Sequence, residues 1–211
     1  KPSKEDLNKI PHHFIGHISI KNPYSVGHYE KDTLKLLKKL FKKHNTLFVC
    51  GGSGLYIQSI CEGLNYFPKV NKKIKQTINN DLITKGLNHL IQELKSIDIE
   101  TYEKIDRQNP RRIMRALEVY RSSGKPYSFY TNKKIPKRDF QILYIALKIP
   151  RKLLYNNIDN RVDDMIQNGL IQESEILYEY RENQALQTIG YQEIFKYLDQ
   201  EMSLEKTIEQ I

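Results

Sequence analysis

Apolar residues recur along most of this chain at the three- and four-residue spacing of amphipathic helices. The spacing predicts helices over residues 24–43, over residues 55–62 and repeatedly between residues 71 and 130. Two short runs, residues 46–50 and 140–147, are instead continuously apolar, which predicts buried parallel strands. The first run leads through a glycine-rich turn into a helix. This order favours an α/β fold with a parallel sheet.

The same pattern divides the chain into three expected parts. Residues 1–70 and 139–211 contain the two strand candidates and would form the first and second parts of an α/β core. Residues 71–138 show helical spacing without a strand signal, so they would form an all-helical insertion.

The composition favours a basic protein that acts on a polyanion. The 211 residues include 34 Lys and Arg against 25 Asp and Glu, a formal net charge of +9. No apolar run approaches the ~20 residues of a membrane-spanning helix, so we expect no membrane contact. Two cysteines cannot build a disulfide framework and fit a reducing compartment, and no signal-peptide pattern follows Lys1. We therefore expect a cytoplasmic location.

The glycine-rich turn Gly-Gly-Ser-Gly at residues 51–54 is one candidate site. Ligands of open α/β sheets bind where a turn follows the carboxyl end of a strand. Ser53 could contact such a ligand, or it could cap the helix that follows, and both interpretations stay open. The turn lacks the Lys and Ser or Thr of a triphosphate-binding loop, and no such loop occurs elsewhere in the chain.

An arginine-rich helix is the second candidate site. Five of the nine arginines lie between residues 107 and 121, and Arg111, Arg112 and Arg115 follow an Asn-Pro pair that predicts a helix start. Cations at a helix start are unfavourable, and an external polyanion would reverse that cost. Guanidinium groups also suit phosphates and base edges. The alternative is that neighbouring acidic side chains pair with these arginines.

Arg161 lies among Asp159, Asp163 and Asp164 in a predicted helix. An arginine in this setting usually forms surface ion pairs of little energetic value. Apolar neighbours leave a second interpretation open, in which the side chain reaches the edge of a pocket.

Other common chemistries find little support. His12, His13 and His17 lack carboxylates or cysteines at ligand spacing, so we expect no metal site in this chain. Ser53 is not part of a GxSxG turn and has no histidine and aspartate ordered for a hydrolase triad.

A series of motifs then identifies one family. In chain order they are PHHFI (11–15), PYS (23–25), VCGGSGLYI (49–57), GL (63–64), NPRRIMRALEVY (109–120), SGKP (123–126), RVDDM (161–165), GL (169–170) and IGYQE (189–193). With these motifs the chain resembles the tRNA dimethylallyltransferases, or IPP transferases, over essentially its whole length. The number and order of the motifs make the resemblance specific.

The resemblance implies a P-loop-kinase-like fold whose parallel sheet core is incomplete here, with a helical insertion that grips the anticodon stem-loop of tRNA. It implies transfer of a dimethylallyl group from dimethylallyl diphosphate to the N6 amine of the adenine 3′ of the anticodon. It also implies Mg²⁺ as cofactor, and we expect a monomer.

The resemblance further implies roles for individual residues. Ser53 stands where the family usually has threonine, whose hydroxyl helps to hold the adenine amine. Arg161 matches an arginine that reaches the diphosphate. Gln192 stands where many relatives have Arg or Lys. The positions that match tRNA contacts are Lys75, Arg111, Arg112, Ile113, Met114, Arg115, Gln187, Thr188, Ile189, Gly190, Tyr191 and Gln192.

Both ends depart from the family pattern. The family's phosphate loop and proposed general-base aspartate precede the segment that begins here with Lys1, and its basic tail would follow Ile211. We therefore expect a core fragment, inactive alone, with the Mg²⁺ ligands mainly in the preceding segment. The alternatives are a non-catalytic RNA-binding module, an adenylate prenyltransferase or a relative of the P-loop kinases.

Overall fold

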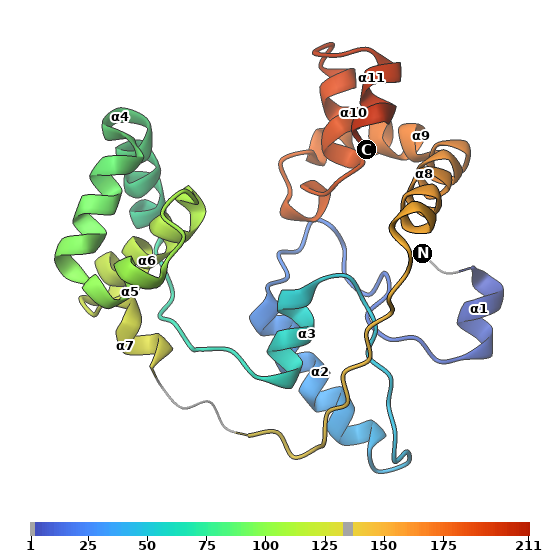
Figure 1. The fold of residues 1–211 in the computed structure, drawn as a ribbon, viewed down its shortest axis with the longest axis horizontal. Coiled ribbons are helices and arrows are strands. Elements are labelled where there is room, and N and C mark those ends of the chain that lie inside the picture. Colours follow the sequence, from blue (N-terminus) through green and yellow to red (C-terminus); the bar gives the residue numbers. More distant parts are fainter. Residues whose placement is uncertain (1–2, 133–136) are drawn as a thin grey trace. The chain divides into compact units, whose positions relative to one another are not determined.

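The computed structural model describes residues 3–132 and 137–211, which form helices joined by turns and extended segments (Figure 1). The chain separates into two compact units. One combines Lys1–Ser25 with Leu143–Ile211, and the other is Val26–Ile142. The three-part division expected above stays a prediction.

The predicted parallel sheet, and with it the α/β and P-loop-kinase-like fold class, is wrong for the described residues. They contain no strand, and neither strand candidate forms a strand ladder with another described segment. Phe48 is 90% exposed, and Leu143 and Leu147 are 83% and 87% exposed. A strand exists only where a neighbouring segment completes its hydrogen-bond ladder, and no described segment does so for either run. A continuous run of apolar residues does not show whether a neighbouring strand is present to pair with it.

In the unit Val26–Ile142, helices α2 (Val26–Leu40) and α3 (Gly54–Cys61) pack against each other. Arg138 joins them. It donates to the carboxylate of Glu30 on α2 at 2.5 Å and to the backbone carbonyl of Ile60 near the end of α3 at 2.7 Å. Glu30 is only 4% exposed, so its carboxylate needs a positively charged partner, and Arg138 is that partner.

The described residues of the same unit form four further helices, which we call the helical lobe: α4 (Lys72–Ile97), α5 (Ile99–Lys104), α6 (Pro110–Ser123) and α7 (Tyr127–Thr131). These are the helices expected between residues 71 and 130. Their shared core consists of fully buried side chains from α4 and α6, namely Ile78, Leu90, Leu94, Ile113, Ala116 and Leu117. Helix α4 bends at Gly86, so residues on both sides of the bend reach this one core.

The other unit consists of α1 (Lys4–Lys9), α8 (Arg151–Gln167), α9 (Leu170–Leu177), α10 (Tyr191–Leu198), α11 (Leu204–Gln210) and the short 3₁₀ turns η1 (Tyr178–Tyr180) and η2 (Gln184–Leu186). Its buried side chains include Leu186, Ile194 and Phe195. Helix α8 buries none of its residues. In neither unit is any described helix both long and apolar enough to span a membrane.

Candidate nucleic-acid interface

The start of α6 presents the arginine cluster. Asn109 caps the helix by accepting a hydrogen bond from the Arg112 backbone N–H at 3.3 Å, and Pro110 occupies the first turn. Ile113 is fully buried on the opposite face. Since that face is fixed in the core, Arg111 and Arg112 are left exposed at the helix start.

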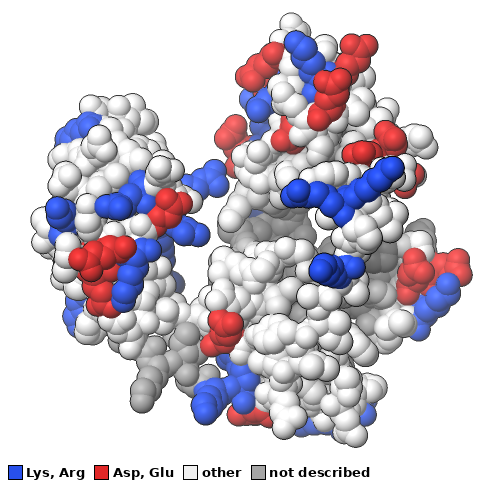
Figure 2. Space-filling model, in the orientation of Figure 1, with Lys and Arg blue, Asp and Glu red and all other residues white. Residues whose placement is uncertain are grey.

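These arginines border a cavity of about 550 Å³ within the helical lobe. This volume falls in the range of pockets that hold small molecules or parts of larger ones. The cavity is lined by residues of α5, α6 and α7 and the turn between α5 and α6: Glu100, Thr101, Lys104, Ile105, Asn109, Arg111, Arg112, Arg115, Tyr127, Ser128 and Thr131. Basic side chains of Lys and Arg are visible on this lobe, at the left of Figure 2.

The positive charges around the cavity are only partly balanced. Lys104 pairs with Glu100 at 2.7 Å, and Arg115 pairs with Glu118 at 3.1 Å. Within residues 3–132 and 137–211, neither Arg111 nor Arg112 forms an ion pair. The pairing alternative therefore accounts for one of the three arginines, and two guanidinium groups remain to bind an anion.

One lining residue of the cavity, Tyr127, belongs to an aromatic cluster. The rings of Tyr127 and Phe67 stack with centroids 4.6 Å apart, and the Arg115 guanidinium lies over Phe67 at 5.5 Å. Burial raises the pKa of the Tyr127 hydroxyl, and the charges of Arg115 and Arg112 oppose that rise in part. Tyr127 was missed as a site residue from the sequence, although it directly follows the SGKP motif.

We predict that Arg112→Ala weakens binding of an anticodon stem-loop about three- to tenfold and lowers the slope of log affinity against log salt by about one, as expected for a lost phosphate contact. Fluorescence anisotropy at several salt concentrations measures both quantities. Arg107→Ala is the matched control, because Arg107 lies outside the cavity lining and donates to the Tyr102 hydroxyl at 3.1 Å. Equal slopes in the two variants would contradict the assignment.

Ser53 lies at the N-cap position of α3 and is exposed. Its backbone carbonyl accepts from the N–H groups of Tyr56 and Ile57 at 3.1 and 3.2 Å, but its side chain makes no capping hydrogen bond. The Ser53 side chain therefore does not cap α3, which was one of the two interpretations. The hydroxyl remains available to a ligand, and its catalytic role stays a prediction.

Arg161 lies on the exposed surface of α8. In the described part of the chain it pairs with none of the three aspartates near it in sequence. The expected surface ion pair is therefore missing, which leaves the guanidinium able to bind an external anion. Its role toward a diphosphate stays a prediction.

The six predicted tRNA contacts at residues 187–192 form one loop that runs into α10. Gln187 donates to the Arg181 carbonyl at 2.7 Å, and Gly190, at a φ of 96°, donates its N–H to Glu193 at 2.7 Å. These bonds fix the loop, and Ile189 at its tip is 76% exposed. Burial raises the pKa of Tyr191, and nearby Glu173 raises it further. The remaining predicted contacts are exposed Lys75 on α4 and half-buried Met114 on α6.

The predicted residues fall into both compact units. Ser53, Lys75 and the arginine cluster belong to Val26–Ile142, whereas Arg161 and the loop at residues 187–192 belong to the other unit.

Comparison with known proteins identifies the family. The family model of the IPP transferases matches residues 1–211. The chain belongs to the IPP transferase family. The chain is 45% identical over 210 residues to the tRNA dimethylallyltransferase of Christiangramia forsetii, and 38% identical over 210 residues to tRNA dimethylallyltransferase 1 of Bacteroides fragilis. In both comparisons the alignment covers 100% of this chain and 70% of the relative.

Solved structures agree with this assignment. A eukaryotic dimethylallyltransferase described as acting on tRNA matches 99% of this chain with a TM-score of 0.78 and 26% identity. The tRNA isopentenylpyrophosphate transferase of Bacillus halodurans matches 100% with a TM-score of 0.62 and 29% identity. The matches cover 54% and 66% of those two chains. The comparisons confirm the predicted family and its enzyme class, the tRNA dimethylallyltransferases.

Proposed function

We propose that the protein transfers a dimethylallyl group from dimethylallyl diphosphate to the N6 amine of the adenine 3′ of the anticodon in tRNA. The observation that carries the proposal is the match to one family of tRNA-modifying enzymes along all 211 residues. The net charge of +9 and the two unpaired arginines at the cavity of the helical lobe support an RNA substrate.

The proposed reaction breaks the bond between carbon 1 of the dimethylallyl group and the diphosphate oxygen, and forms a bond from that carbon to N6. Diphosphate leaves, and the amine loses one proton. We assign to Arg161 the neutralisation of the leaving diphosphate and to Ser53 a hydrogen bond that orients the amine. The adenine must leave its base stack before its amine can react.

Mg²⁺ remains a proposed cofactor. Within the described residues, no group of three or more His, Cys, Asp or Glu side chains is arranged to hold a metal ion. The described residues alone therefore do not supply a complete set of protein ligands for the ion. Omitting Mg²⁺ from the assay below tests the requirement.

We also propose that the protein acts in the cytoplasm as a monomer. The two free thiols, Cys50 and Cys61, fit a reducing compartment. Light scattering on the purified protein measures the oligomeric state, and a mass of two copies would overturn the monomer.

The test uses the protein from the complete open reading frame with Mg²⁺, dimethylallyl diphosphate and an anticodon stem-loop that carries adenines 3′ of the anticodon. Mass spectrometry of the RNA should show a five-carbon gain on one adenine. Ser53→Ala should lower the transfer rate about 10- to 100-fold, because one orienting hydrogen bond is lost, and leave stem-loop affinity unchanged.

Ser59→Ala is the control on the same helix, since the buried Ser59 hydroxyl donates to the Tyr56 carbonyl at 2.7 Å and reports damage to α3 itself. Its transfer rate should stay close to that of the unmodified protein. Binding of the stem-loop without any mass gain would instead indicate an RNA-binding module. Prenylation of free adenylate but not of the stem-loop would indicate an adenylate prenyltransferase.

A further inference from the structure

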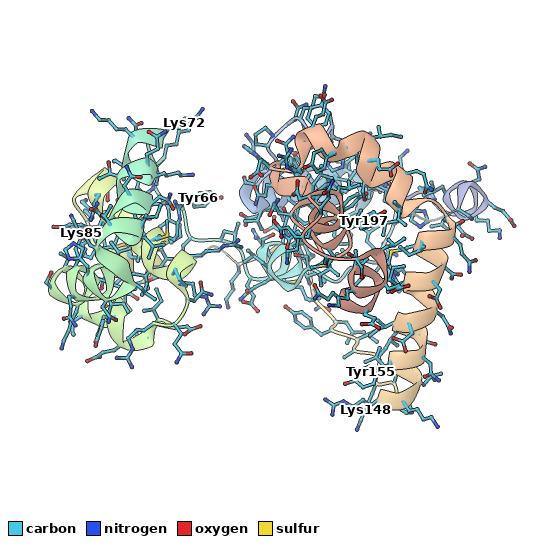
Figure 3. All side chains as sticks on the ribbon, turned by 90° about the horizontal axis from the view of Figure 1, so that it is seen from above. Tyr66, Lys72, Lys85, Lys148, Tyr155 and Tyr197 are labelled. Carbon is cyan, nitrogen blue, oxygen red and sulfur yellow. The ribbon has the colours of Figure 1, made fainter. Side chains whose placement is uncertain are left out.

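Helix α4 consists of two helical arms joined at a glycine. Gly86 adopts φ 79° and ψ 169°, a conformation outside the helical region that side chains other than glycine rarely adopt. We call residues 72–85 the first arm and residues 87–97 the second arm. Lys72 and Lys85 mark the two ends of the first arm (Figure 3). Because the backbone is non-helical at Gly86, helical hydrogen bonding alone does not fix the angle between the arms.

One side chain from α6 bonds both arms. The Arg121 guanidinium donates through Nη1 to Asp81 on the first arm at 2.8 Å. It also donates through Nε and Nη2 to Glu93 on the second arm at 2.9 and 2.5 Å. The three side chains are only 22%, 13% and 23% exposed, so solvent screens these ion pairs less than surface pairs. Arg121 on α6 thus links the two arms of α4 across the bend at Gly86.

Asp81 and Arg121 both keep their charges near neutral pH. Hydrogen bonds from Lys85 and then Arg121 lower the pKa of Asp81 to about 2. The hydrogen bond to Glu93 raises the pKa of Arg121, against the opposing effect of burial. Both shifts favour the charged forms of Asp81 and Arg121, the forms that their hydrogen bond requires.

The first arm carries a basic end whose direction depends on the bend. Lys72, Lys73 and Lys75 are exposed at its start, and the first turn contains no acidic residue to offset them. Lys75 is eleven positions from Gly86, which corresponds to about 16 Å along a helix. Rotation of the first arm about Gly86 would therefore move the lysine ammonium groups.

We propose that Arg121 is a positioning residue for RNA binding: by bonding Asp81 and Glu93 across Gly86, it sets the direction in which the lysines of the first arm meet the RNA. The RNA ligand rests on the proposed function, whereas the bridge and its effect on α4 belong to the chain alone. Two measurements separate these claims.

The first measurement needs no RNA. Spin labels on Gln76→Cys and Gln92→Cys, in the full protein with Cys50 and Cys61 replaced by serine, report the distance between the arms. Arg121→Met should broaden the distance distribution, and Arg121→Lys should broaden it less. Lys85→Met is the matched control, because Lys85 pairs with Asp81 at 2.7 Å without crossing the bend, and it should leave the distribution narrow. Equal widths in Arg121→Met and the unmodified protein would overturn the proposal.

The second measurement tests positioning through a coupling that structural damage alone would not produce. Arg121→Met should weaken stem-loop binding about tenfold, and Lys75→Ala should add little to that loss, because the lysine is already displaced. Additive losses would overturn the positioning role. If the unmodified protein binds no stem-loop, the proposed function fails, and the spin-label distances still decide whether Arg121 fixes the bend.

Discussion

Replacing Arg161 with alanine is expected to lower the single-turnover rate of dimethylallyl transfer by about 10²- to 10³-fold, the usual effect of losing one group that stabilises charge in a transition state. Negative charge grows on the diphosphate as the carbon–oxygen bond breaks, and an unpaired guanidinium opposes that growth at no cost of breaking an existing ion pair. Because Arg161 is exposed on α8, the variant should unfold at the same temperature as the unmodified protein.

Two further variants sharpen this experiment. Arg161→Lys keeps the charge without the two-pronged donor geometry and should give an intermediate rate. Arg151→Ala, at the start of the same helix, removes an arginine that lies 5.9 Å from the Tyr155 ring and should leave the rate unchanged. A full rate in Arg161→Ala would remove this residue from the diphosphate site. An equal loss in Arg151→Ala would attribute the effect to the charge of α8 as a whole.

Helix α6 shows what sequence predicts well. Asn109, Pro110 and Gly124 act within one or two turns of the chain, and the structure has the cap, the first-turn proline and a left-handed glycine at φ 68° as those residues favour. The buried face of α6 also follows from spacing alone. Such signals are local, so they need no knowledge of the remaining chain.

The strand predictions failed for the opposite reason. Residues 46–50 and 140–147 have the composition of buried strands, but burial depends on which segments lie alongside. In the described structure no segment pairs with them, and Phe48 and Leu147 remain almost fully exposed. A run of apolar residues favours burial, but it does not determine which segment packs against it.

The candidate interface combines features that local sequence predicts with features that depend on distant parts of the chain. Sequence singled out Arg111, Arg112 and Arg115 as candidates, and the i, i+3 spacing could suggest the pair between Arg115 and Glu118. It could not show that Arg111 and Arg112 stay unpaired, because that depends on α5 and α7. Nor could it find the bridge from Arg121, whose acidic partners lie 28 and 40 positions away in the chain.

Replacing Asp98 with alanine is expected to lower the free energy of unfolding by about 2–3 kcal/mol, since it leaves buried donors without an acceptor and removes a helix cap. Asp98 is 4% exposed. It accepts hydrogen bonds from the Thr101 N–H at 3.1 Å, from the Thr101 hydroxyl at 2.7 Å and from the Ser128 N–H at 2.9 Å. It therefore ties the start of α5 to α7. Urea titration followed by circular dichroism measures the loss.

The pH dependence of this loss tests the charge of Asp98. Burial raises the pKa of Asp98, but the hydrogen bonds from Thr101 and Ser128 lower it more, so the net change is downward. A carboxyl with a lowered pKa stabilises the fold above its unfolded pKa of about 4, and this stabilisation is lost as the pH falls through the folded pKa. The difference between Asp98→Ala and the unmodified protein should thus be full at pH 7 and shrink below about pH 4.

Thr101→Val provides the matched control, because it removes one hydroxyl donor and keeps the carboxylate with its two backbone partners. It should cost about 1 kcal/mol, the usual net value of one hydrogen bond. Since α5 and α7 both line the cavity that Arg111 and Arg112 border, Asp98→Ala should also weaken stem-loop binding under conditions where the protein is still folded. A loss of stability that persists unchanged at low pH would contradict a charged Asp98. Full RNA affinity in Asp98→Ala would show that RNA binding does not depend on the position of the cavity walls.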